Sequence, residues 1–525
     1  NILQIIEVKT IDNEGYPGSE RQVSPAEWYE KYKRKMMLPF SEPSPKCPLP
    51  KSSFRVPGRL FQVRTFIKRN LLRKLADRQY VILNLVEAPL LAFVLGYFSK
   101  YAVDSNYTFA ANKNYPVFLF MAVVVALFLG LMVSAEEIYK DRKILQREKF
   151  LNISRLSYLV SKVNYLFILS AIQSFLFVLV SSLVLEIRGM FFQQWLIFFT
   201  TACYGNMLGL NISSGMKTVV SIYILIPLIL VPQLLLGGAM IKFDDLQRSL
   251  TNREYVPFIG DVMATRWSYE AIMVEGYRGN RYNKHTFRYN LEIEQNNYYK
   301  DELIKYLKNE IITYFLQLKN PGQERAKAEQ KIRILKYHTG ELSKITGILP
   351  GKWIENLSYD NFTQQTADSA EVFFGRVKEF FISENRYWLR LKYEAENKLT
   401  ASLTPEKIQI LATGYNNARL ADFVLNQTGF LDEKPFIIYR NRFIQKSTPI
   451  YMKPTSSWGR AHYYAPFKRI GTLEINTLFF NMGAIWIMTL VFFVTLYYNL
   501  LYRFIEFLTR QPIPFRRKFG RHLLG

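Results

Sequence analysis

Charged side chains beside long uncharged runs are the candidates for chemistry in this sequence. Glu87 is the single ionisable residue within the apolar segment Val81–Ser99. A carboxylate inside a membrane is costly and often marks an ion or substrate path. Two interpretations stay open: Glu87 serves such a path, or it pairs with a basic residue of the preceding helix near the inner membrane surface.

A second charged group lies between residues 136 and 162. Glu136, Arg147 and Glu148 precede the segment "LSYLVSK", which ends at Lys162. Charges of both signs between two apolar runs fit a short helix that lies along the inner surface and offers its charges to a partner. A solvated loop is the alternative.

A third group is the stretch "DVMATRWSYEAIMVEGY", residues 261–277. As a helix it carries one apolar stripe that includes Trp267, and Arg266 and Glu270 stand one turn apart at its edge, where they can pair. We expect it either to dip into the outer leaflet with its charges neutralised or to begin the outer domain as an ordinary surface helix.

The sequence carries no motif for hydrolysis, redox chemistry or metal binding. Its four histidines are scattered, with no Cys or His at ligand spacing. The segment "GILPGKW", residues 347–353, is one residue short of a phosphate-binding loop and has Trp353 where a magnesium-binding hydroxyl is needed. No ATPase signature of the "LSGGQ" kind and no nucleophile motif is present. We therefore predict no catalytic, cofactor-binding or metal-binding residue in this chain.

Six apolar segments must position these charges. A bilayer core about 30 Å thick needs about 20 apolar residues per helix, and soluble helices are seldom apolar on every face over that length. The six predicted spans are Val81–Ser99, Pro116–Ala135, Val163–Leu185, Gly189–Met216, Thr218–Ile241 and Ile475–Tyr502.

Basic residues predict the orientation of these spans. The formal net charge is +25, but the cations lie next to spans rather than on a nucleic-acid-reading surface, so nucleic acid is not expected as a partner. Lys51–Tyr80, the loop 136–162 and the tail from Arg503 are rich in Lys and Arg. The positive-inside rule makes all three cytoplasmic, with both termini inside and Lys242–Glu474 outside.

The predicted fold is a mainly α-helical polytopic membrane protein. Its parts are a cytoplasmic leader and linker (1–53), a basic amphipathic helix in the membrane interface or against another domain (54–80), five spans (81–241) with the surface helix 136–150, a large and mostly helical external domain (242–474) that begins with helix 261–277, the sixth span (475–503) and a basic cytoplasmic tail (504–525).

This order of parts resembles the transmembrane half of White-type (G subfamily) ABC exporters and related bacterial permeases. Glu136, the Arg147–Glu148 pair and "LSYLVSK" look like that family's coupling region, which ends in the third span. "RWSYEAIMVEGY" looks like its re-entrant helix after the fifth span. The resemblance covers roughly residues 54–278 and 470–508.

The resemblance implies a dimer of such halves, with ATP-binding domains docked on the surface helix through Glu136, Arg147 and Glu148. It also implies a path along the dimer axis. By counting along the helices, the family's substrate-contacting positions fall near Ala126 and Leu129, and its leucine plug falls near Ile224 and Leu225.

ATP and Mg²⁺ would be held by the partner nucleotide-binding domain. That domain would lie upstream on the same polypeptide, consistent with the start at Asn1, or in another chain. The external block is far larger than in the eukaryotic members and lacks their extracellular cysteines, so their substrates are not carried over.

The leading hypothesis is a permease that works with an ATPase in the bacterial inner membrane. It would export an amphipathic or lipid-like substrate by alternating access, surrounded by membrane lipid. The alternative is a transmission protein whose external domain binds an envelope protein while no substrate crosses the bilayer. A channel or ion-coupled carrier that uses Glu87 is a third hypothesis.

Overall fold

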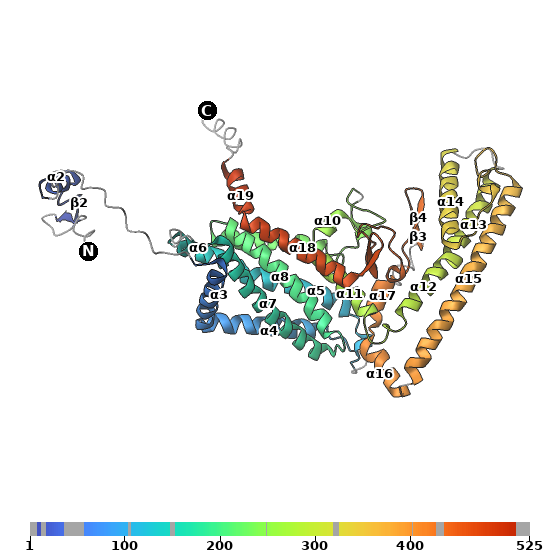
Figure 1. The fold of residues 1–525 in the computed structure, drawn as a ribbon, viewed down its shortest axis with the longest axis horizontal. Coiled ribbons are helices and arrows are strands. Elements are labelled where there is room, and N and C mark those ends of the chain that lie inside the picture. The colour runs from blue at the N-terminus through green and yellow to red at the C-terminus, as the bar shows by residue number, and fades with distance from the viewer. Residues whose placement is uncertain are drawn as a thin grey trace, which may run out of the picture. The chain divides into compact units, whose positions relative to one another are not determined.

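The structure, a computed structural model, describes residues 8–11, 17–35, 57–102, 107–147, 153–247, 249–318, 325–401, 403–426 and 435–510. The chain divides into two compact units, Asn1–Pro57 and Gly58–Gly525, both drawn in Figure 1.

The first unit, which was predicted to be a leader and linker, contains regular secondary structure. Strands β1 (Lys9–Ile11) and β2 (Pro17–Arg21) pair antiparallel, and helix α2 (Pro25–Lys35) follows them. Ser24 and Glu27 form a capping box, in which each backbone N–H donates to the other residue's side chain at 3.3 and 3.2 Å. The proline-rich end of the predicted leader, with Cys47, lies outside the described residues.

The second unit opens with two helices that meet at Asp77. Helix α3 (Arg59–Ala76) ends there, and α4 (Arg78–Ser99) begins there with the Asp77 carboxylate accepting the N–H of Tyr80 at 3.0 Å. Figure 1 shows α3 running across the direction of α4 and of the other long helices. Such an arrangement suits an interfacial helix that precedes a span.

The long apolar helices are α5 (Tyr115–Ser134), α7 (Arg155–Leu185), α8 (Phe191–Gly215), α9 (Val219–Leu235) and α18 (Thr477–Tyr497). Among the described residues, four helical segments are long and apolar enough to cross a membrane: Arg78–Ser99, Tyr115–Arg147, which includes the short helix α6 (Glu137–Arg147), Arg155–Leu185 and Thr477–Tyr497. The protein is a multi-pass membrane protein.

The other two predicted spans correspond to α8 and α9, which do not meet this criterion. Helix α9 is apolar but has 17 residues. Helix α8 has 25 residues but carries amides such as Asn206 and Asn211, both buried within the unit. Two of these amides bind other helices: Asn206 donates to Ser170 Oγ of α7 at 2.7 Å, and Asn211 donates to the Phe492 carbonyl of α18 at 2.9 Å.

Helices α5 and α8 pack with their backbones in close contact. A Cβ on Gly205 would lie 2.5 Å from the Leu127 carbonyl oxygen of α5, and a Cβ on Gly130 would collide with the Ala202 carbonyl of α8. Gly209, one turn beyond Gly205, meets α5 in the same way. Because these glycines have no side chain, the two helix backbones can touch, as they do where small residues recur at four-residue spacing between membrane helices.

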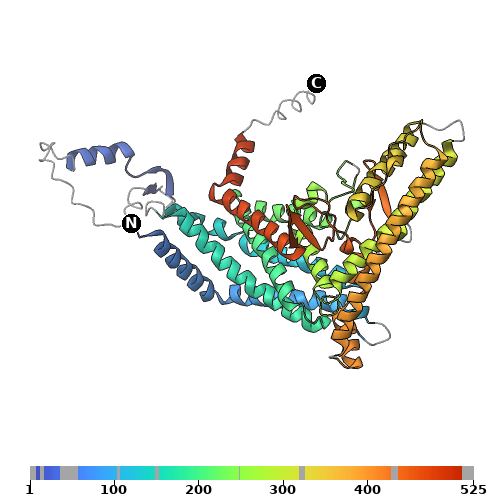
Figure 2. The ribbon, with the colours of Figure 1, turned by 45° about the vertical axis from the view of Figure 1, so that its right-hand side comes forward.

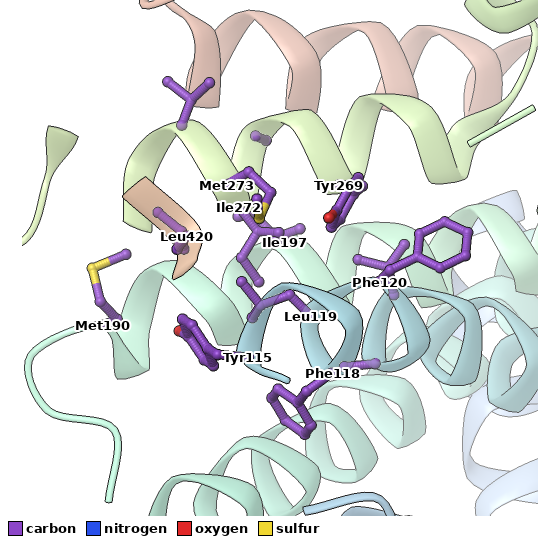
Figure 3. Packing of buried hydrophobic residues seen from close by; sticks show 14 of the residues in the cluster. Tyr115, Phe118, Leu119, Phe120, Met190, Ile197, Tyr269, Ile272, Met273 and Leu420 are labelled. Carbon is purple, nitrogen blue, oxygen red and sulfur yellow. The ribbon is translucent and has the colours of Figure 1, made fainter. Parts of the chain in front are cut away.

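Helix α11 (Ala264–Arg278) lies between these helices and α18. Figure 3 shows Tyr269, Ile272 and Met273 of α11 pointing toward the α5 residues Tyr115–Phe120 and toward Ile197 of α8, while α18 passes on the other side. All residues of α11 except Gly276 and Arg278 are buried. The sequence showed one apolar stripe with a charged edge and left two alternatives open; because partners cover every face of α11, the ordinary surface helix does not fit.

The block between α9 and α18, which the sequence predicts to be external, is mainly helical. Its helices are α10 (Phe258–Asp261), α12 (Phe287–Asn297), a π-helical turn (Tyr298–Leu303), α13 (Ile304–Leu318), α14 (Arg325–Thr346), α15 (Gln364–Ala401), α16 (Pro405–Tyr415) and α17 (Ala418–Leu425). Short 3₁₀ turns lie at Phe109–Ala111, Phe243–Asp245, Lys352–Ile354 and Pro449–Tyr451. Two antiparallel hairpins complete it: β3 (Phe436–Tyr439) with β4 (Arg442–Gln445), and β5 (Phe467–Ile470) with β6 (Leu473–Asn476).

Helices α12–α15 gather at the end of the second unit that is remote from α3, and Figure 2 shows α15 running along the whole group. Helices α13–α15 share a hydrophobic core of their own, which includes Leu307, Leu335 and Phe374, whereas Phe287 and Leu291 of α12 pack in the core of the bundle. At the opposite end α19 (Leu500–Arg510) turns away from α18.

Candidate functional site

Two acidic residues on one face of α6 are buried at the end of the bundle that meets α3. Glu137 and Asp141 stand one turn apart, and both side chains are about 5% exposed. Lys162 of α7 lies between them, with its Nζ 2.9 Å from Glu137 Oε2 and 2.7 Å from Asp141 Oδ2. The buried ammonium of Lys162 therefore joins α7 to two successive turns of α6.

Helix α3 supplies two further cations to the same acids. Lys74 pairs with Glu137, and Arg73 Nη1 lies 2.9 Å from Asp141 Oδ1. Burial lowers the pKa of Lys74, although Glu137 opposes that shift. Buried charges are tolerated only when they are paired in this way, and loss of one partner typically costs about 3–5 kcal/mol. The ion pairs thus fix α3, α6 and α7 to one another.

The first turn of α6 is also tied to the end of α8. Ser213 Oγ accepts the backbone N–H groups of Ile138 and Tyr139, each at 3.0 Å. Arg142 donates from Nη2 to the Met216 carbonyl at 2.9 Å. A side-chain oxygen at a helix start and a cation at a helix end satisfy backbone groups that the helices cannot satisfy themselves.

Glu136, which directly precedes α6, contacts both α6 and α9. Tyr223 of α9 donates its hydroxyl to Glu136 Oε1 at 2.6 Å, and Lys140 lies 2.6 Å from Oε2. The Glu136 side chain is 19% exposed. Helix α6 therefore contacts α3, α7, α8 and α9 through polar side chains.

The opposite face of α6 is exposed and basic. Lys140, Lys143, Ile144 and Arg147 recur at helical spacing, and all four are exposed. Of the three predicted coupling residues, Glu136 faces the bundle and Arg147 faces outward, while Glu148 lies outside the described residues.

Sequence reasoning missed Glu137 and Asp141 on the buried face of α6. Their four-residue spacing beside Ile138 was the available signal, because it places two acids and an apolar residue on one face. Lys162 was noted only as part of the family-like segment. The partners of Arg73 and Lys74, in the basic helix predicted over 54–80, were not predicted either; both residues pair with α6.

A second buried ion cluster lies between α11, α18 and β5. Arg266 Nη1 is 3.5 Å from Glu270 Oε2, so the two residues predicted to pair do lie together. Lys468 Nζ and Asn481 Nδ2 each reach the same oxygen at 2.8 Å. Burial lowers the pKa of Lys468 to about 8, so it stays cationic at neutral pH beside Glu270. The cluster fixes the external β5–β6 hairpin to the bundle.

Trp267, the third predicted residue of α11, closes one side of this cluster. Its ring lies 3.9 Å from the Arg266 guanidinium and 4.4 Å from Lys468 Nζ, measured to the ring centroid. Cations over an aromatic face are stabilised by the ring quadrupole. Its indole Nε1 donates to the Asp261 carbonyl at 2.7 Å.

The four predicted path residues do not share one surface. Ala126 and Leu129 are buried and line a small cavity between α5, α7 and α8 together with Gln173. Ile224 is 68% exposed, and Leu225 is half-buried. The exposed face of α5 holds Val117 and Met121, so counting along the helix selected its inward face.

Glu87 is half-buried on α4 and has no ion pair with any described residue. The predicted pairing with a basic residue of the preceding helix is thus not present in the described part of the chain. Lys74 and Arg73, the cations at the end of α3, are engaged by Glu137 and Asp141 instead.

A family comparison accounts for this arrangement. The family described as ABC-2 type transporter matches residues 61–274. This segment is similar to the ABC-2 type membrane domains. It contains nearly all of α3, the apolar helices up to α9 and most of α11. No curated protein matches the chain.

An ABC-2 type membrane domain is the permease part of an ABC transporter, and an ABC ATPase is its general partner. The matched segment includes α6 with the residues that bind it to α3, α7, α8 and α9. Helices α12–α15, α18 and α19 lie outside the match.

Proposed function

We propose that this permease belongs to an ATP-driven exporter and moves an amphipathic or lipid-like substrate by alternating access. An ABC ATPase, in another part of the polypeptide or in another chain, would hold ATP and Mg²⁺. The White-type resemblance in the coupling region and in residues 266–277 supports this subfamily and the export direction. A bacterial inner membrane location rests on the same resemblance.

The two faces of α6 are the observation that carries the proposal. Its buried acids bind the bundle, whereas Lys140, Lys143, Ile144 and Arg147 face outward. A helix with one fixed face and one free face can receive a partner and pass its displacement on. The free face is basic with one apolar residue, so the docking surface of the ATPase is expected to be acidic around an apolar recess.

Displacement of α6 would reach the apolar helices by three routes. Lys162 carries it to α7, Ser213 carries it to α8, and Tyr223 carries it to α9. Because these contacts are ion pairs and hydrogen bonds in a closely packed bundle, the helices would move as bodies rather than deform. This is the motion that alternating access requires.

The substrate path in this proposal lies between two permease copies. Exposed apolar side chains follow α9 at helical spacing, including Val220, Ile224, Leu228 and Val231. On α5 the exposed face carries Val117 and Met121. A second copy packed against these faces would enclose an apolar path. The full proposal has six spans, with α8 and α9 as the fourth and fifth, and both termini inside.

The decisive experiment is purification of the protein in lipid nanodiscs from its native source, with mass spectrometry of every chain and an ATPase assay. We expect an ATP-hydrolysing domain to copurify. The variant Lys140→Glu/Lys143→Glu should reduce its binding at least tenfold, whereas Lys331→Glu, an ion-paired lysine of the external helices, should leave it unchanged. Purified protein that lacks any ATPase, or equal binding by both variants, would contradict the proposal.

A second candidate function has one observation in its favour. Helices α13–α15 have a core separate from that of the bundle, which suits a binding module. In this alternative the bundle transmits ATP-driven motion to an envelope protein bound outside. Deleting residues 287–401 discriminates between the two: transport that survives favours export, and loss of a copurifying envelope protein favours transmission.

A further inference from the structure

A cavity of about 560 Å³ lies at the outer end of α9, where the chain leaves the bundle. Its walls come from the turn after α9, from residues 252–256 and from α17. Two further segments, one around Lys446 and one around Tyr463, complete them. It belongs to a single chain and is separate from the faces of α5 and α9 proposed for the path. Its volume is in the range of small-molecule sites in proteins.

One wall of the cavity is apolar and reaches the outer end of a membrane-facing helix. Ala239, Met240 and Ile241 follow α9 directly, and Met240 is 66% exposed. Behind them, the rings of Phe243 and Tyr463 pack edge to face, with their centroids 5.0 Å apart. An exposed apolar stretch of this kind next to an apolar helix fits contact with acyl chains.

A glycine shapes this wall. Gly238 has φ +80°, a conformation that side chains rarely adopt, and a Cβ there would lie 2.6 Å from the Phe243 ring. Tyr463 donates its hydroxyl to the Gly237 carbonyl at 3.0 Å. Specific contacts therefore fix the conformation of this turn, and the cavity wall that it forms is part of the folded structure.

The remaining walls carry equal numbers of opposite charges. Four cations and four acids line the cavity: Lys242, Arg253, Arg419 and Lys446, with Asp244, Asp245, Glu254 and Asp422. Lys446 Nζ is 2.7 Å from Asp244 Oδ1, and Arg419 Nη1 is 3.6 Å from Asp422 Oδ2. A ligand with one net charge meets as much repulsion as attraction on such a wall, whereas a ligand with both charges finds a partner for each.

We infer that this cavity binds an amphipathic molecule with a zwitterionic head group, its head among the paired charges and its chains along Ala239–Ile241. The inference goes beyond the export proposal, since it assigns a binding site that one chain forms by itself, away from the proposed path. A phospholipid of the outer leaflet and an exported molecule of the same chemistry can both supply this ligand.

Photo-crosslinking tests the inference on the full protein with its copurifying chains. The protein is placed in nanodiscs of phosphatidylethanolamine and phosphatidylglycerol that contain a photoactivatable phosphatidylethanolamine, or in a parallel sample photoactivatable phosphatidylglycerol. Labelled peptides are mapped by mass spectrometry. We expect the zwitterionic probe to label residues 238–256 and 419–426 at least fivefold more than the anionic probe.

Two variants whose new side chains fill the cavity should specifically reduce the labelling. Ala239→Trp and Met452→Trp, from different walls, should each reduce labelling at least tenfold. Leu349→Trp is the matched control, because Leu349 is 83% exposed in the external domain and lies away from the cavity. Size-exclusion profiles show which variants fold, and either filling variant alone suffices for the comparison.

The outcomes separate the two sources of the ligand. Labelling without nucleotide assigns a leaflet phospholipid, and labelling that appears only during ATP hydrolysis assigns a molecule delivered by transport; each supports the site. Equal labelling by both probes, absence of label from these peptides, or undiminished labelling in both folded filling variants would overturn it. Only the assignment to a transported molecule uses the export proposal; the comparison of probes and of filling variants tests the site independently of it.

Discussion

Lys162 Nζ lies 2.9 Å from Glu137 Oε2, and both side chains are almost completely withdrawn from solvent. The same ammonium is 2.7 Å from Asp141, so one lysine of α7 neutralises two acids of α6. Lys74 and Arg73 of α3 complete the set. The junction therefore depends on Lys162 more than on any cation at its edge.

The variant Lys162→Met should lower the free energy of unfolding by about 3–5 kcal/mol, because it leaves two buried acids short of a partner. Thermal unfolding in detergent, followed by tryptophan fluorescence, measures the change. Lys331→Met removes the half-exposed pair with Glu310 and should cost about 0–1 kcal/mol. Adding Glu137→Leu to Lys162→Met should recover part of the loss, and a double variant less stable than the single one would argue against this account.

Gly205→Ala should destabilise the bundle by about 1–3 kcal/mol, the usual cost of overpacking. The new Cβ would lie 2.5 Å from the Leu127 carbonyl oxygen, and the backbone of α5 cannot yield as a flexible side chain would. Gly483 of α18 is the matched control, since a Cβ there meets nothing within 4 Å. Gly483→Ala is expected to be neutral or stabilising. Equal unfolding midpoints for the two variants would show that α5 and α8 do not pack as closely as described.

The sequence allowed the apolar helices and the helical character of the external block to be predicted, because both follow from local composition and periodicity. The order of parts also led to the resemblance that the ABC-2 type match supports at its coarser level. Arg266 and Glu270 were paired correctly because the pair is one turn apart on one helix.

Long-range partners were not predictable in this way. Lys468 is 198 residues from Glu270, and Asn481 is further still, so no local pattern connects them. Ala126 lies on the inward face of α5; because a helix turns 100° per residue, a shift of one or two residues in counting exchanges an inward face for an outward one, so counting along the helix could not predict its burial. The contact between Glu136 and Tyr223 was not predictable either, because Tyr223 belongs to another helix.

His338 of α14 makes the external domain sensitive to acid. Its Nε2 accepts the N–H of Phe443 at 2.8 Å, and burial lowers its pKa to about 4. A histidine whose folded pKa is depressed binds fewer protons than in the unfolded chain, so stability falls as the pH drops from about 6.5 toward 4. At pH 5 the loss should reach about 2 kcal/mol.

Thermal unfolding of the wild-type protein and of His338→Gln between pH 7 and pH 5 measures this effect. Glutamine can accept the same N–H but does not titrate, so the difference between the two proteins isolates the histidine. The wild type should lose more stability than the variant over this range. The same pH dependence in both would exclude His338 as the cause.

Tyr223→Phe should loosen α9 from α6 while leaving the ATPase contact intact. The substitution removes only the hydroxyl that reaches Glu136 Oε1 at 2.6 Å, a bond of about 1 kcal/mol at this partly exposed position. Spin labels at the exposed positions Gln146 and Leu228 report the α6–α9 distance by pulsed electron resonance without any knowledge of the substrate. We expect one narrow distance distribution in the wild type that shifts with nucleotide, and a broad distribution with a smaller shift in the variant.

Tyr97→Phe removes an exposed hydroxyl on α4 and should behave as wild type. A nucleotide-dependent shift of full size in Tyr223→Phe would show that α9 receives its motion by way of α8, through Ser213 and the carbonyls that Arg142 binds.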